Sequence, residues 1–145
     1  MKNVLALVIF SLIFSCCSNK KFTSSDMPDE KITFGSGGGF SGYYTEYVLL
    51  KNGQLFQKMK QGQELIELAP ITKKDAKSLF ERSDELKLAT MDFKEPDNYT
   101  HYIEVTTTEH QNKIAWGKQE VPISSDIKEF FRQLKLLPHN NKKTN

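Results

Sequence analysis

Beyond position 17 the sequence contains no cysteine, because its two cysteines are the adjacent Cys16 and Cys17. A disulfide between neighbouring residues is strained and closes no loop, so it would not stabilise a fold. The absence also excludes a nucleophilic thiol and a cysteine-ligated metal site from this part of the chain. We therefore expect a folded part that depends on an ordinary hydrophobic core.

An excess of charge of one sign is also missing. The 145 residues include 20 Lys and Arg and 18 Asp and Glu, a net charge of +2. Proteins that bind nucleic acid through their overall field carry a larger basic excess, so we expect no nucleic-acid partner. The histidines are scattered. His101 lies on the apolar, aromatic face of an expected strand and Glu104 lies on its opposite face, so we expect neither a metal site nor a cofactor.

No apolar run is long enough to cross a membrane. Residues 4–14, VLALVIFSLIF, form a run of eleven, whereas a spanning helix takes roughly 20 residues. With Lys2 in front, this run has the layout of an export signal. The residues that follow, Ile13-Phe14-Ser15-Cys16, resemble a bacterial lipobox, with an aliphatic residue three positions before the cysteine and a small residue directly before it.

The lipobox resemblance implies that residues 1–15 are a lipoprotein signal peptide and that Cys16 becomes an acylated N-terminus. Acylation of Cys17 is one alternative, and an ordinary secretory signal is another. Several acyl chains would anchor the protein stably, since each buried methylene contributes about 0.8 kcal/mol. No acidic residues directly follow Cys16, so the resemblance implies an outer-membrane protein of the cell envelope that faces the periplasm.

A polar segment without periodicity, SNKKFTSSDMPD at 18–29, follows the cysteines. This composition is typical of a flexible tether, which we place at residues 16–30. A random coil of this length would hold the domain roughly 20 Å from the bilayer.

Glycines are concentrated at the start of the expected domain, where residues 35–42 contain five of them. Three of these match the dinucleotide-binding spacing G-x-G-x-x-G, but that motif must open a helix. Here the next residues, YYTEYVLL, predict a strand. We therefore interpret the glycines as a flexible or bulged strand connection, with a ligand-binding loop as the alternative. The candidate loop residues are Gly35, Gly37, Gly38, Gly39, Gly42, Tyr43 and Tyr44.

Asn52-Gly53 predicts a tight turn between two strands, because this dipeptide strongly favours β-hairpins. A three-residue loop with a glycine bulge would place Leu50 opposite Gln54, whereas a two-residue loop would pair Leu49 with Phe56. We favour the bulged register, which gives the more apolar face.

Periodicity predicts the remaining elements. They are a strand at 64–68, a helix at 70–86 capped by Thr72, strands at 99–106 and 113–117, and a second helix that starts at Ser124 or Ser125 and ends at Pro138. We therefore expect one α+β domain at 31–138, in the order strands, helix, strand pair, helix. Its antiparallel sheet of about five or six strands would carry both helices on one face. Residues 139–145 would be a disordered tail.

This succession of elements resembles uncharacterised small lipoproteins of Bacteroidetes-type bacteria. The resemblance rests on the glycine-bearing first strand, an aromatic strand ending in Asn52-Gly53, a helix beginning Ile71-Thr72, a Pro96-Asp97-Asn98 turn and a short final helix. It covers most of residues 31–137. Because those proteins carry no assigned activity, the resemblance implies no functional residue.

Three functions fit these observations. We expect a non-enzymatic binding module that presents a sheet face or the glycine loop to an envelope protein, a peptide or a glycan. Its contact residues, if exposed, would be Tyr43, Tyr44, Tyr47, Tyr99 and Tyr102. One alternative is an inhibitor of a periplasmic hydrolase that inserts the loop at 35–43. The other is an enzyme without a recognisable motif, which would require a deep pocket with perturbed titratable groups.

Overall fold

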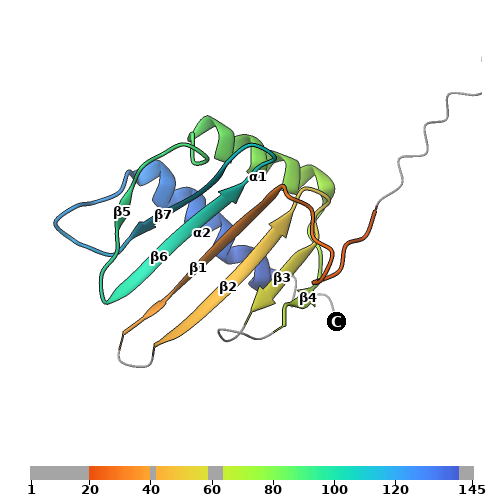
Figure 1. Ribbon diagram of the computed structural model, residues 1–145, viewed down its shortest axis with the longest axis horizontal. Coiled ribbons are helices and arrows are strands. Elements are labelled where there is room, and N and C mark those ends of the chain that lie inside the picture. Colours follow the sequence, from red (N-terminus) through yellow and green to blue (C-terminus); the bar gives the residue numbers. More distant parts are fainter. Residues whose placement is uncertain (1–19, 40–41, 59–63, 141–145) are drawn as a thin grey trace, which may run out of the picture.

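The computed structural model describes residues 20–39, 42–58 and 64–140 (Figure 1). The fold is α+β, with seven strands in one mostly antiparallel mixed sheet and two helices. The elements are β1 (Lys31–Gly38), β2 (Tyr43–Leu50), β3 (Leu55–Lys58), β4 (Ile66–Leu68), α1 (Lys73–Glu85), β5 (Lys94–Glu95), β6 (Tyr99–Thr106), β7 (Gln111–Trp116) and α2 (Ser125–Asn140).

The sheet has the strand order β4-β3-β2-β1-β6-β7-β5, with β1 at its centre. The sheet therefore has more strands than the expected five or six, and it is not entirely antiparallel. The difference includes β5, a two-residue strand that pairs parallel with β7. Its sequence lies in a turn-rich stretch and has no strand periodicity, so tertiary pairing alone defines it.

Both helices lie on the same side of the sheet, here called the helix face (Figure 1). The opposite side is called the open face. Alternate residues of β1, such as Ile32 and Phe34, point toward the helices, where they join Phe80 of α1 and Phe130 of α2 in the main core. Burying each such side chain contributes about 1.5–3 kcal/mol, so this layer provides most of the driving force for folding.

The helix boundaries confirm one prediction and contradict another. Thr72 caps α1, with its hydroxyl oxygen accepting a hydrogen bond from the Asp75 N–H at 3.1 Å. However, α2 continues through Pro138 to Asn140, so the prediction that Pro138 ends the helix is wrong. Proline removes one backbone donor, and in the last turn of a helix that loss affects a single bond. Of the expected tail, 141–145 lie outside the described residues.

The hairpin register matches the bulged alternative. Leu49 pairs with Leu55, the Leu50 N–H donates to the Gln54 carbonyl at 3.0 Å, and the Gly53 N–H donates to the Leu50 carbonyl at 3.0 Å. Gly53 has a φ of +95°, which side chains rarely adopt, so glycine is required at this turn.

The glycine-rich stretch differs from the expected connection, because β1 runs to Gly38. Gly35 and Gly37 are therefore strand residues, and tyrosine rings fill the space where their side chains would lie. A Cβ on Gly35 would be 2.8 Å from the Tyr102 hydroxyl, and one on Gly37 would be 2.6 Å from the Tyr44 ring. These two glycines make room for aromatic side chains on the open face.

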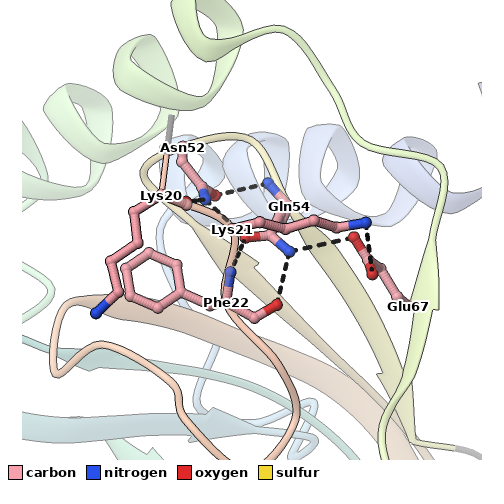
Figure 2. Close-up of polar contacts among 6 residues, drawn as sticks. All are labelled: Lys20, Lys21, Phe22, Asn52, Gln54 and Glu67. Atoms are coloured by element: carbon pink, nitrogen blue, oxygen red, sulfur yellow. Dashed lines mark hydrogen bonds and ion pairs between the residues drawn. The ribbon is translucent and has the colours of Figure 1, made fainter. Parts of the chain in front are cut away.

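The segment expected as a tether contacts the domain from Lys20 onward, beside the β2–β3 turn (Figure 2). The side-chain amide of Gln54 accepts a hydrogen bond from the Phe22 N–H at 2.8 Å and donates one to the Phe22 carbonyl at 2.9 Å. It also donates to Glu67 at 3.1 Å and accepts from Asn52 at 2.7 Å. We call Phe22, Asn52, Gln54 and Glu67 the Gln54 clamp.

Apolar contacts reinforce the clamp. Phe22 and Met27 pack on the open face against a small cluster of buried side chains, Val48, Leu50 and Phe56. Because Gln54 is only 5% exposed, its amide is largely shielded from competing water. Residues 20–30 are therefore held to the sheet, which the polar composition of this segment did not predict.

Candidate functional site

A groove of about 730 Å³ lies on the helix face beside α2. The start of β6, the end of β7, the loop at 117–123 and the outer side of α2 form its walls. α1 lies at the other end of the strands, next to the β2–β3 turn (Figure 1). The strand ends around Tyr99 are thus left accessible beside α2.

The floor of the groove is aromatic. The His101 ring lies 5.3 Å from Tyr99, 5.7 Å from Trp116 and 5.2 Å from Phe131, measured between ring centroids. Trp116 and Phe131 are 4.9 Å apart in an edge-to-face arrangement, a favoured geometry for aromatic pairs. His101 and Trp116 are register partners on β6 and β7, so the sheet itself sets their positions.

His101 is the one imidazole in this floor, and its electrostatics are unusual. Its Nδ1 atom is buried and has no hydrogen-bond partner among the residues that the structure describes. Burial lowers the pKa of His101 below its ordinary 6.5, and the positive charge of Lys135 lowers that pKa further. The ring is therefore neutral at pH 7, with an unused polar atom facing an apolar setting.

The rim of the groove is cationic. Lys128, Arg132 and Lys135 recur along α2 at positions i, i+4 and i+7, which places them on one stripe of the helix, and His139 at i+11 continues this stripe. The loop residue Lys118 adds a further cation. Aspartate and glutamate are absent from the described residues that line the groove.

Two of these cations are already paired. Arg132 forms a two-pronged contact with Glu129 at 2.8 and 2.7 Å, and Lys118 binds Glu95 at 2.8 Å. Within the described part of the chain Lys128 and Lys135 form no ion pair; the Lys135 ammonium instead lies 5.7 Å from the Phe131 ring centroid. The groove therefore presents two uncompensated positive charges above an aromatic floor.

This arrangement suits binding better than catalysis. The described lining contains no serine, threonine, cysteine or carboxylate, so His101 has neither a nucleophile to activate nor an acid to orient it. Across the described residues, no three His, Cys, Asp or Glu side chains gather to hold a metal ion. The groove can nevertheless take a ligand through ring contacts and charge.

A second hollow, of about 480 Å³, lies on the open face around Tyr102. The Tyr102 hydroxyl donates to the Glu46 carboxylate at 2.6 Å, and the Lys113 ammonium lies 3.9 Å from the centroid of the Tyr102 ring. Burial, and then the bond to Glu46, raise the pKa of Tyr102 far above its usual value. The phenol therefore stays protonated and holds Glu46 in place, which is a structural role.

The predicted glycine-loop residues are divided between β1 and the turn that follows it. Gly35, Gly37 and Gly38 belong to β1, and only Gly39 and Gly42 remain in the described part of the turn. The loop expected to insert into a hydrolase is correspondingly shorter.

The tyrosines of the same prediction point in different directions. Tyr43 and Tyr44 are 62% and 43% exposed, but as neighbours in a strand they face opposite sides of the sheet. Tyr99 is 53% exposed at the groove, whereas Tyr102 is buried and Tyr47 is half-buried. The predicted lipidation site, Cys16, lies outside the described residues.

Sequence reasoning placed His101 on an apolar, aromatic strand face, and the structure confirms this. It missed the cationic stripe of α2, although the i, i+4, i+7, i+11 spacing was present in the sequence. No sequence pattern in the loop at 117–123 indicated that it would form a wall of the groove.

Comparison with known proteins does not change this interpretation. No protein-family model matches the chain, and no curated protein matches it either. Neither described helix is long and apolar enough to cross a membrane. The site must therefore be interpreted from its own geometry.

Proposed function

We propose that this protein is a lipid-anchored lipoprotein of the bacterial cell envelope, and that its domain is a non-enzymatic binding module. The anchor would be Cys16, in the outer membrane facing the periplasm, and the binding surface would be the groove beside α2. The observation that carries the binding role is the aromatic floor with a cationic rim and no carboxylate, serine, threonine or cysteine in its described lining.

The size and surface of the groove support this role. Ligand sites in proteins are concave, typically about 300–1,000 Å³, and largely apolar with a few polar groups. The groove meets this description, and two large apolar side chains remain accessible at its edge, with Tyr99 53% and Leu136 42% exposed. Apolar side chains left exposed around a hollow are typical of a surface that a partner covers.

The Gln54 clamp supports the anchored arrangement. Three residues separate Cys16 from Lys20, where contact with the domain begins. A fully extended chain would place Lys20 at most about 14 Å from an acylated Cys16. The groove is at the other end of the sheet, because Tyr99 pairs with Gly38 while Leu50, beside the clamp, pairs with Lys31. The groove would therefore face away from the anchoring point.

Crosslinking in intact cells tests the binding role. A photo-reactive amino acid at Leu136, on the groove edge, should capture a partner that the same amino acid at Lys77, on the exposed side of α1, does not capture. Identical products from the two positions would overturn the groove as the binding surface.

Mass spectrometry of the mature protein tests the anchor separately. We expect an acylated Cys16 as the first residue. An unmodified Cys16, or a mature chain starting elsewhere, would contradict the lipoprotein assignment without affecting the groove.

A further inference from the structure

We propose that the groove binds an organic anion that carries an apolar group, that is, a carboxylate, phosphate or sulfate attached to an aromatic or alkyl body. This inference rests on the proposed function, because it takes the groove to be the binding surface, and it adds the chemical class of the ligand. Three features of the groove carry it: its uncompensated charge, its apolar floor and the unpaired nitrogen of His101.

The charge of the groove selects an anion. Lys128 and Lys135 are two helical turns apart, about 10 Å along α2, and neither has an acidic partner among the described residues. Some exposed cations elsewhere on the described surface, such as Lys51 and Lys77, are paired with Glu30 and Glu81, and others are not. Lys128 and Lys135, however, are the described lysines without an ion pair that line this groove. Free lysines above a groove without carboxylates therefore favour a negative ligand.

The floor of the groove selects an apolar body. Trp116 and Phe131 are already buried, but a small inorganic anion would leave the Tyr99 ring and the Leu136 side chain in contact with water. A ligand with an aromatic or alkyl group would cover this surface, and burial of apolar area is the main source of affinity in such sites. The volume of about 730 Å³ leaves room for such a group.

His101 would supply a specific contact between these two parts. Its buried Nδ1 has no partner among the described residues, and a buried polar atom left unpaired is unfavourable. The Lys135 ammonium and the His101 ring both lie next to Phe131, at 5.7 and 5.2 Å from its ring centroid, so an anionic group held by Lys135 would lie near the imidazole. Nδ1 is shielded from the groove as the ring stands, so a ligand oxygen or nitrogen would pair with it only if the imidazole turned toward the groove.

Nuclear magnetic resonance tests the inference, since Trp116 is the only tryptophan of the chain and lies in the groove. The full-length, ¹⁵N-labelled protein in unlabelled lipid nanodiscs should give one indole N–H signal. We expect naphthalene-2-carboxylate to shift that signal in a saturable way. The neutral 2-naphthalenemethanol should bind about tenfold more weakly, and acetate, which lacks the apolar body, should be weaker still.

Variants test whether Lys128 and Lys135 bind the anionic group. The double variant K128Q/K135Q should lose about tenfold or more in affinity for naphthalene-2-carboxylate, while its indole signal without ligand stays in place. The matched control K77Q, on α1, should bind like the unmodified protein. Equal binding of the acid and the alcohol, or an unchanged affinity in K128Q/K135Q, would overturn the preference for an anion.

The two proposals fail in different ways. If Leu136 captures a partner in cells but naphthalene-2-carboxylate leaves the indole signal unchanged, the ligand class is wrong and the binding role stands. If the Leu136 position yields no more product than Lys77, the proposed function itself is wrong, whatever the small anion does.

Discussion

The Gln54 clamp and the groove differ in how a buried polar side chain is hydrogen-bonded. Gln54 is surrounded by Phe22, Asn52 and Glu67, and both ends of its amide are hydrogen-bonded (Figure 2). His101 lies among aromatic rings at the other end of the sheet and on the other face, and its Nδ1 has no partner among the described residues.

The comparison distinguishes a structural role from a binding role. A satisfied hydrogen bond contributes about 0.5–1.5 kcal/mol, whereas an unpaired buried group costs about 1–3 kcal/mol. The hydrogen bonds of the clamp therefore stabilise the fold, whereas the unpaired Nδ1 of His101 lowers the free energy of unfolding. The unpaired nitrogen is one of the features behind our proposal that the groove is a binding surface.

The largest effect is expected on the closely packed open face, from Gly35→Ala. The new methyl group would collide first with the backbone carbonyl oxygen of Thr45 on β2 and then with the Tyr102 hydroxyl, which contacts Glu46. We expect the free energy of unfolding, measured with urea, to fall by about 3 kcal/mol.

Gly39→Ala is the matched control for that substitution. Its Cβ meets no atom within 4 Å, so only the φ of +70° opposes it, at a cost of about 1–2 kcal/mol. If both variants lost the same free energy of unfolding, the close packing around Gly35 would not explain the effect.

Gln54→Leu breaks the clamp and should have the next largest effect. It leaves both backbone groups of Phe22 without their partner, so we expect a loss of about 1–3 kcal/mol. Hydrogen exchange at the Phe22 amide should accelerate. Gln133→Leu on the exposed side of α2 should stay within about 0.5 kcal/mol of the unmodified protein. Similar exchange at Phe22 in both variants would show that the clamp does not hold the segment.

His101→Phe should sharpen the contrast, because it removes the unpaired nitrogen and keeps an aromatic ring. We expect no loss of stability, or a gain of up to about 1 kcal/mol, together with weaker binding of naphthalene-2-carboxylate. A loss comparable to that of Gln54→Leu would mean that His101 serves the fold.

The same variant predicts a change in pH dependence. The folded pKa of His101 lies below its ordinary 6.5, so between the two values the unfolded chain binds more protons than the folded chain. Stability must then fall as the pH drops from above 6.5 toward the folded pKa. The unmodified protein should lose more stability than His101→Phe over this window in urea titrations at several pH values, and parallel curves would contradict the prediction.

The smallest effect on stability is expected from Lys135→Gln, within about 0.5 kcal/mol. Because the charge of Lys135 lowers the pKa of His101, its removal should raise that pKa. An imidazole titration followed by nuclear magnetic resonance measures the shift, with Lys77→Gln as the control. If the pKa of His101 were the same in both variants, the charge of Lys135 would not act on the imidazole in the groove.

Local signals in the sequence were sufficient for much of the fold. The Asn52-Gly53 turn determines the hairpin register through backbone geometry, and Thr72 marks the start of α1 through a side-chain cap. Both depend on residues close together in the chain. The Pro138 prediction failed because a rule for helix interiors was applied to a final turn.

Features that depend on distant contacts were not predictable in this way. The clamp joins Phe22 to Gln54 across 32 positions, and nothing in the polar tether composition indicates that pairing. α2 runs along the helix face of the sheet (Figure 1). The groove lies beside it, and Tyr99 at its edge is 53% exposed. Sequence reasoning could therefore place His101 among aromatic residues, but it could not reveal the space beside it.

The most direct test of the groove as the ligand site is a map of backbone amide shifts in the full-length ¹⁵N-labelled protein with naphthalene-2-carboxylate. The changes should be concentrated at the start of β6, in residues 116–123 and along α2 from Lys128 to His139. Changes concentrated in the glycine hairpin at Gly38, Gly39 and Gly42, or in the Gln54 clamp, would contradict the account.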